Sequence, residues 1–232
     1  MEIYPNMLLG AGNPFINAYV QSDWFGKGIF LSLFFLSIVC WIIIAAKLWQ
    51  LWSVKKNCSQ FLTSLNGSKG SPLEWQLPKQ NKDKLHPLFE VFRRIKQRSL
   101  LVLQKRDGKM EMSDLEMIES ESYIAISIVS TRIEKLIFLL PTIASLAPFL
   151  GLLGTVWGIL LTFSELGSAK NNQNEMLAGL SMALATTVLG LLIAIPALVA
   201  NSYLRNEGKV LKKEMEEFSH ELLSAIELEH RS

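Results

Sequence analysis

The chain has 232 residues, of which 50% are hydrophobic and 19% are charged, and its formal net charge is +2. A charge this close to balance argues against nucleic acid as a partner, because phosphate backbones are bound by a concentrated excess of Lys and Arg. The hydrophobic residues occur in long blocks, which argues against an ordinary soluble domain and favours a protein that lies in the lipid bilayer.

The first element along the chain is a polar and aromatic segment, residues 1–26, rich in turn-forming Pro and Gly. We expect it to lie at the outer membrane–water boundary or to form a mobile tail. Three segments without any charged residue follow, at 28–46, 136–164 and 176–204, with lengths of 19, 29 and 29 residues. Because roughly 20 apolar residues in a helix cross a bilayer core of ~30 Å, each segment can span the membrane.

The sequence therefore predicts an all-α integral membrane protein with three transmembrane helices and long cytoplasmic helical extensions. Of the 23 Lys and Arg residues, 15 lie between residues 55 and 135 and five lie after residue 204, and cytoplasmic segments are enriched in these residues. The predicted segments are an outer N-terminal segment (1–26), transmembrane helix 1 (27–49), a cytoplasmic helical loop (50–135), transmembrane helix 2 (136–164), a short periplasmic loop (165–175), transmembrane helix 3 (176–204) and a cytoplasmic helical tail (205–232).

Within the cytoplasmic parts, residues 66–84 have the Gly, Ser, Pro and Lys content of a loop. A later helix is expected to begin at Ser113, where Glu116 three residues on would complete a capping box. No Gly or Pro interrupts the apolar pattern from there to Pro141, so we expect this helix to run into the second span. The third span is expected to continue into the tail unless Gly208 interrupts it.

Motifs of catalysis and metal binding are missing from the sequence. The stretch "GLLGTVWG" has no Lys after it, so it is no phosphate loop, and the three histidines lack metal-ligand spacing. The two cysteines, Cys40 and Cys58, are 18 residues apart, or ~27 Å along a helix, which is beyond disulfide reach. We expect neither an enzyme nor a bound cofactor or metal.

Small residues recur at three- and four-residue steps in the second and third spans. Such faces let helix backbones approach closely in lipid, and we expect them to hold an oligomer together; the alternative is that membrane helices simply tolerate Gly. The candidate helix-packing residues are Ala147, Gly151, Gly154, Gly158, Gly179, Ala183 and Gly190. Pro148 and Pro196 lie inside predicted helices, where proline removes a hydrogen bond, so we expect a kink at each.

Two of these stretches, "APFLGLLGTVWGI" and "ALATTVLGLLIAIPALVAN", resemble the signature of the TolQ/ExbB/MotA family of inner-membrane stator subunits in ion-driven motors. Three spans and a short N-terminus resemble the TolQ/ExbB branch more than four-span MotA, with TolQ slightly favoured. The resemblance implies a pentameric ring around a dimeric, single-span partner of the TolR or ExbD type that supplies an acidic residue. It further implies a bacterial inner-membrane location and proton flow coupled to work at the cell envelope.

The resemblance places the polar positions of the ion path at Thr155 and Thr187. Counted from the short outer loop, these residues lie at matching depths of ~15 and ~18 Å. Each hydroxyl could instead bond a carbonyl of its own helix, which is a purely structural role. The family usually has a Glu where this chain has Met182, so no proton role is carried over to that position. Proton and sodium both remain open as the coupling ion.

Two readings of a different class are compatible with the charge-free spans. A non-conducting membrane scaffold would use the long cytoplasmic helices to recruit other proteins, and a solute-transporter subunit would work with an ATPase. Spans without titratable groups provide no proton relay by themselves, which suits the scaffold. The family motifs favour the proton-channel subunit.

Overall fold

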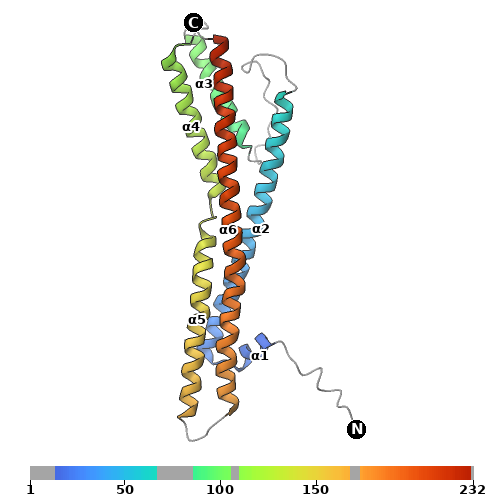
Figure 1. Ribbon diagram of the computed structural model, residues 1–232, viewed down its shortest axis with the longest axis vertical. Helices are drawn as coiled ribbons and strands as arrows, with labels where there is room; N and C mark the ends of the chain where they lie inside the picture. The colour runs from blue at the N-terminus through green and yellow to red at the C-terminus, as the bar shows by residue number, and fades with distance from the viewer. Residues whose placement is uncertain (1–13, 67–85, 106–109, 168–172, 231–232) are drawn as a thin grey trace, which may run out of the picture. The chain divides into compact units, whose positions relative to one another are not determined.

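A computed structural model describes residues 14–66, 86–105, 110–167 and 173–230. They form six helices: α1 (Pro14–Gln21), α2 (Trp24–Asn66), α3 (Pro87–Lys105), α4 (Met112–Glu134), α5 (Leu139–Leu166) and α6 (Gln173–His230) (Figure 1). Three stretches, within Trp24–Leu65, Met112–Leu166 and Gln173–Glu229, are long and apolar enough to cross a membrane. The predicted all-α fold with three such helices is thereby confirmed. The expected loop at 66–84 falls almost entirely outside the described residues.

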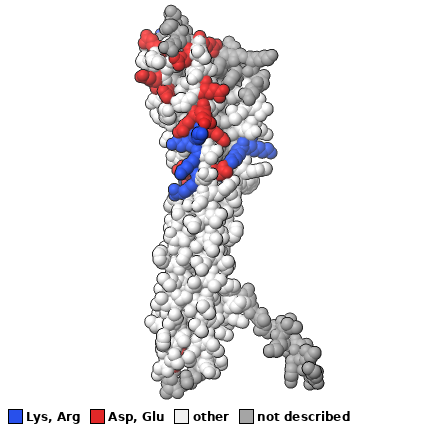
Figure 2. All heavy atoms as spheres, viewed as in Figure 1, with Lys and Arg blue, Asp and Glu red and all other residues white. Residues whose placement is uncertain are grey.

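The chain divides into two compact units, each built from segments that are distant in the sequence. The apolar unit comprises Met1–Ala45 and Leu136–Ser202, and the charged unit comprises Ala46–Lys135 and Tyr203–Ser232. Helices α2 and α6 contribute to both units. On the face shown in Figure 2, Lys, Arg, Asp and Glu gather on the charged unit, whereas the apolar unit is nearly free of them.

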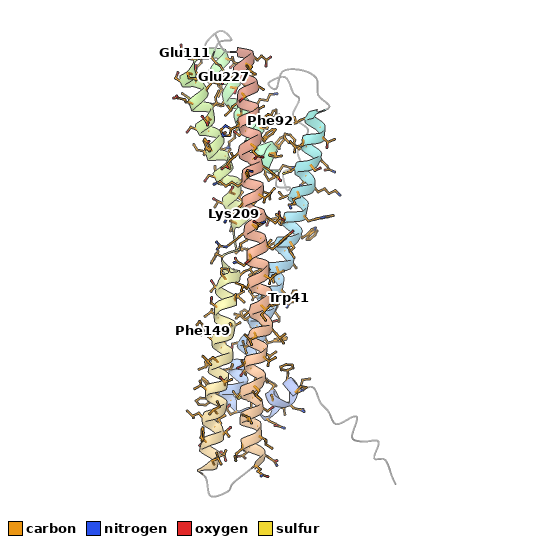
Figure 3. The ribbon with its side chains drawn as sticks, in the orientation of Figure 1. Trp41, Phe92, Glu111, Phe149, Lys209 and Glu227 are labelled. Carbon is orange, nitrogen blue, oxygen red and sulfur yellow. The ribbon has the colours of Figure 1, made fainter. Side chains whose placement is uncertain are left out.

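Within the apolar unit, large side chains of α2 and α5 point away from the protein. Trp41 is 59% exposed and Phe149 is 68% exposed (Figure 3). Large apolar side chains on the outside of a helix are unfavourable in water and favourable against lipid or a neighbouring protein. These faces of α2 and α5 therefore indicate contact with lipid or with another protein.

A short helix lies within the N-terminal segment that we expect at the membrane boundary or as a mobile tail. Helix α1 begins at Pro14, a residue favoured at a first helical position because its fixed φ suits the helix and its missing N–H is not needed there. Asp23 separates α1 from α2, and its Oδ1 accepts the Gly26 N–H over 2.9 Å. This bond satisfies one of the free N–H groups at the start of α2.

The predicted start of the helix that precedes the second span is wrong. Helix α4 begins at Met112, one residue before Ser113, and its N-cap is Glu111. The Asp114 carboxylate accepts the Glu111 N–H over 3.1 Å, so an acidic pair forms the reciprocal cap that we assigned to Ser113 and Glu116.

The expected unbroken run of this helix into the second span is also wrong. Helix α4 ends at Glu134 and α5 begins at Leu139, and between them Leu136 adopts a φ of 71°. A residue other than glycine in this left-handed conformation destabilises the fold by about 1–3 kcal/mol. The break leaves the carbonyl of Ile133 without its helical partner, and the buried Lys47 ammonium donates to this oxygen over 3.1 Å. The contact between an α2 side chain and the α4 main chain could not be read from periodicity.

The charged unit has its own core. Phe61 of α2 lies edge-on to three other rings, with centroid distances of 6.0 Å to Phe89, 5.9 Å to Phe92 and 6.1 Å to Phe218. The apolar stripe of α6 is buried in the same unit at Leu211, Met215 and Ile226. The apolar residues of α6 beyond its membrane-spanning segment therefore pack within the chain. Helix α6 continues through Gly208 without interruption.

Candidate functional site

The small residues of α5 and α6 meet in a seam inside the apolar unit. A Cβ built on Gly151 would lie 2.9 Å from the carbonyl oxygen of Thr186, and one built on Gly190 would lie 2.6 Å from that of Ala147. Those distances are shorter than real Cβ contacts, so the two backbones touch where these glycines lie. A Cβ on Gly154 would overlap the Thr186 hydroxyl, and one on Gly158 would overlap the Gly179 carbonyl.

All seven candidate helix-packing residues lie on this seam or are buried beside it. Ala147 is 0% exposed and Ala183 is 2% exposed. We expected this face to join subunits, whereas the structure places the chain's own neighbouring helix against it. Antiparallel helices joined by a short connection pack on each other readily, and small residues let them approach closely. Contacts between subunits would then need other faces of these helices.

Thr155 and Thr187 lie on opposite sides of the same seam. Thr155 Oγ1 donates to the carbonyl of Leu152 on its own helix over 2.6 Å, whereas Thr187 Oγ1 donates across the seam to the carbonyl of Gly151 over 3.3 Å. In a regular helix the Gly151 carbonyl also receives the N–H of the residue four positions on, which is Thr155. The structure thus brings the two threonines to one place along the α5–α6 pair, and both are partly exposed.

Thr186 is the most buried polar group of the seam, and it is not among the residues that the family resemblance places in the ion path. Its side chain is 0% exposed, and its hydroxyl lies 3.0 Å from the Met182 carbonyl, 3.1 Å from that of Ala183 and 3.4 Å from that of Gly151. A hydroxyl buried among apolar residues needs such acceptors to avoid a desolvation cost. Its signal in the sequence was the pair of threonines in "ATTVLG", of which only the second matched the family position.

Pro148 lies inside α5 and Pro196 lies inside α6. Each lacks the N–H that would bond to the carbonyl four residues earlier, Ala144 or Leu192. The kinks expected at these residues remain predictions.

A carboxylate, that of Asp23, lies beside Met182. Met182 is the residue that stands where the family resemblance implies a Glu. Trp157 of α5 donates its indole N–H to Asp23 Oδ2 over 3.1 Å. A Cβ placed on Gly26 would lie 2.6 Å from the Met182 sulfur and 2.8 Å from Asp23 Oδ1, so both groups border the same glycine. The chain therefore brings an acidic group to this place from the start of α2. Sequence reasoning missed Asp23, whose one signal was its position shortly before a charge-free segment.

Asp23 also borders a cavity of about 280 Å³ within the apolar unit. Met182, Glu165 and Glu175 line the same cavity, so three carboxylates lie around it. In the part of the chain that the structure describes, no group of three His, Cys, Asp or Glu side chains is placed to hold a metal ion. The cavity therefore offers acidic groups and room for water.

Comparison with known proteins gives the family context. A family model described as the MotA/TolQ/ExbB proton channel family matches residues 88–217, more than half of the chain. An ExbB-like 2 biopolymer transport protein of Helicobacter pylori strain 26695 is 43% identical over 89 residues, which are 38% of this chain and 59% of that protein. The biopolymer transport protein ExbB of Aquifex aeolicus is 45% identical over 74 residues, or 32% of this chain and 50% of its own length.

A longer match runs along most of the chain at lower identity. The biopolymer transport protein ExbB of Neisseria meningitidis serogroup A is 24% identical over 204 residues, which are 84% of this chain and 89% of that protein. The two shorter matches above thus span only about half to three fifths of those relatives.

Proposed function

Because this chain belongs to the MotA/TolQ/ExbB proton channel family, whose members are multi-pass inner-membrane proteins and not enzymes, we propose that it is the channel subunit of an ion-driven motor. The motor would couple the proton motive force to work at the cell envelope. The observation that carries the proposal is the position of two hydroxyls at the α5–α6 seam. Thr187 donates across the seam to the Gly151 carbonyl, one helical turn before Thr155, and the apolar segments of both helices lack charged residues.

The proposed assembly is a ring of identical subunits, pentameric as the family resemblance implies, around a single-span partner. The partner supplies what the apolar segments of this chain lack, namely an acidic residue inside the membrane. The names of the three relatives support the ExbB branch and an ExbD-type partner, and they do not support our slight preference for TolQ.

In the proposed mechanism the two threonine hydroxyls guide water toward the partner's carboxylate. Each hydroxyl donates its proton to a main-chain carbonyl and keeps oxygen lone pairs that can accept from water. Without such water, a carboxylate in hydrocarbon would cost several kcal/mol to ionise. Protonation of this group would then shift the balance between two arrangements of ring and partner.

The experiment replaces Thr155 and Thr187 with Val, which keeps the shape and removes the hydroxyl. We expect the double variant to assemble with its partner but to lose proton-driven function in a strain that lacks the native gene. Thr142→Val is the matched control, because the Thr142 hydroxyl donates to the carbonyl of Phe138, the N-cap of α5, over 3.2 Å and not across the seam. Full complementation by the double variant would exclude the threonine pathway and favour a non-conducting scaffold or transporter subunit.

We also propose that the N-terminus and the connection between α5 and α6 lie outside, with residues 50–135 and the tail inside. The support is the distribution of Lys and Arg. The test introduces Cys at Ser164 near the end of α5, or at Ser64 near the end of α2, where both serines are exposed. A membrane-impermeant thiol reagent should label only Ser164→Cys in intact spheroplasts. Labelling of Ser64→Cys alone would reverse the orientation.

A further inference from the structure

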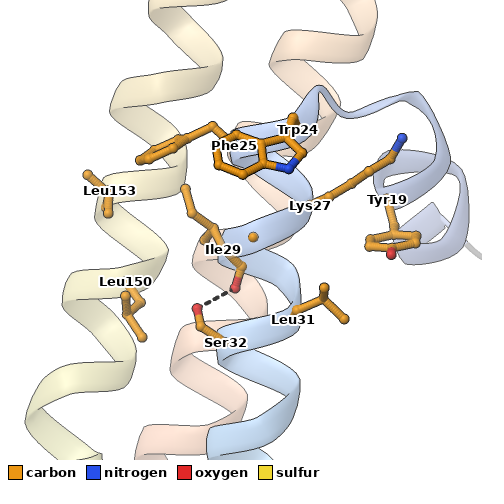
Figure 4. A pocket seen from close by; sticks show the side chains of 10 residues that line it. Tyr19, Trp24, Phe25, Lys27, Ile29, Leu31, Ser32, Leu150 and Leu153 are labelled. Atoms are coloured by element: carbon orange, nitrogen blue, oxygen red, sulfur yellow. Dashed lines mark hydrogen bonds between the residues drawn. The ribbon is translucent and has the colours of Figure 1, made fainter.

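The apolar unit contains a second cavity, of about 510 Å³, between α1, the start of α2 and α5. Tyr19, Trp24 and Lys27 line it together with the apolar Leu31, Leu150 and Leu153. Figure 4 shows Trp24, Phe25 and Lys27 toward one end, Leu31 and Ser32 toward the other, and the two α5 leucines along one side. The cavity therefore combines a cationic and aromatic end with an apolar wall.

We propose that this cavity binds a phospholipid from the leaflet that surrounds the start of α2, with its phosphate at Lys27 and an acyl chain along Leu31, Leu150 and Leu153. Lys27 is the only Lys or Arg among the described residues of the apolar unit. It directly precedes the charge-free segment 28–46, where the bilayer core meets the headgroups. An ammonium at this depth attracts lipid phosphate, and Trp and Tyr are enriched at the same level.

The acidic neighbour of Lys27 does not compete for this position. Both carboxylate oxygens of Asp23 have partners, the Gly26 N–H at 2.9 Å and the Trp157 N–H at 3.1 Å, and Asp23 borders the other cavity.

The apolar wall of the cavity lies at the distance from Lys27 that a lipid tail has from its headgroup. Leu31 lies four residues after Lys27, or ~6 Å along the helix, as an acyl chain follows its headgroup into the bilayer. Leu31 is 57% exposed and Leu153 is 44% exposed, so hydrocarbon would cover surface that the protein leaves open.

Gly28 lines the cavity, and the space next to its Cα is open. A Cβ built on Gly28 would meet nothing within 4 Å, unlike the seam glycines, which have backbone or side-chain atoms in that space. Glycine inside a helix costs about 1 kcal/mol relative to alanine, and here no contact of the chain requires it. A lipid in the cavity would occupy the space that the missing side chain leaves. A larger residue at Gly28 should therefore displace the lipid without disturbing protein packing.

The test is native mass spectrometry of the whole 232-residue chain, released from nanodiscs that contain phosphatidylglycerol. We expect retained lipid per subunit to fall at least tenfold in Gly28→Phe, which fills the cavity, and in Lys27→Gln, which removes the charge. Lys27→Arg should keep the lipid. Ile38→Phe is the matched control, because Ile38 is an exposed residue of α2 that does not line the cavity.

Retention of lipid in either Gly28→Phe or Lys27→Gln would overturn the proposal. Two further outcomes would name another occupant and overturn it as well. Release of the lipid by added inorganic phosphate would show a site for the free anion. A changed number of subunits in Gly28→Phe, but not in Ile38→Phe, would show that a second copy of the chain fills the cavity. Circular dichroism that matches the native spectrum establishes that each variant is folded.

Discussion

Trp157 in α5 holds Asp23 at the start of α2 through an indole N–H bond of 3.1 Å to Oδ2. The ring of Phe25 packs on the same indole, with centroids 4.4 Å apart. A polar bond and an aromatic contact thus join two helices that are more than a hundred residues apart in the sequence. Since an ionised carboxylate near the bilayer needs hydrogen-bond partners, this pair fixes where α2 begins relative to α5.

Trp157→Phe should therefore weaken the apolar unit. The substitution keeps a ring against Phe25 and removes the donor to Asp23, and a hydrogen bond to a charged group contributes about 1.5–3 kcal/mol. We expect a lower midpoint of thermal unfolding in detergent. Asp23→Asn, which keeps an acceptor oxygen, should lose less than Trp157→Phe. Equal midpoints for all three proteins would show that the bond does not stabilise the fold.

Gly154→Ala should separate α5 from α6, because its Cβ would overlap the Thr186 hydroxyl. Overpacking of a close-packed contact costs typically 1–3 kcal/mol. The matched control is Gly208→Ala in the same helix as Thr186, where an added Cβ meets nothing within 4 Å. That change should be neutral or stabilising by up to about 1 kcal/mol, since alanine favours the helix. Chemical denaturation in mixed micelles would compare the two, and a Gly154 variant as stable as the Gly208 variant would contradict the close seam.

Lys47→Met should loosen the end of α4. The Lys47 ammonium is buried and donates to the Ile133 carbonyl over 3.1 Å and to Gln50 Oε1 over 2.9 Å. Methionine keeps the bulk of the side chain and leaves the carbonyl without its donor, at a cost of about 1–3 kcal/mol. Hydrogen exchange should become faster over the last turn of α4, with Lys56→Met as control. Unchanged exchange in that turn would mean that water replaces Lys47 without loss.

Cys58 should react slowly with alkylating reagents. It lies in the charged unit, beyond the charge-free segment, and burial raises the pKa of its thiol to about 11. Only the thiolate reacts, so a thiol with an ordinary pKa near 9 should react ~100-fold faster at pH 8. Between pH 9 and 10 the rate at Cys58 should rise about tenfold, whereas an exposed thiol levels off. Ser64→Cys on the same helix provides that comparison by site-resolved mass spectrometry, and parallel pH profiles would refute the shift.

The sequence was informative where local pattern decides structure. Charge-free segments identified the long apolar helices, and the spacing of Gly151, Gly154 and Gly158 identified the face of α5 that packs closely. It failed where contacts between distant residues decide. No residue near Leu136 in the sequence indicates that the helix stops there. The side chain that bonds the freed carbonyl of Ile133 is Lys47, which comes from another helix. The role of Asp23 was hidden for the same reason, since its partner Trp157 is 134 residues away.

The seam between α5 and α6 also has a mechanical consequence. Where Gly151 and Gly190 bring the two backbones into contact, no flexible side chain lies between them to absorb a twist. Neither helix can turn about its own axis without first lifting away from the other, which would break the bond from Thr187 to the Gly151 carbonyl. We therefore expect the two helices to move together as one rigid hairpin in the proposed motor, rather than to rotate against each other.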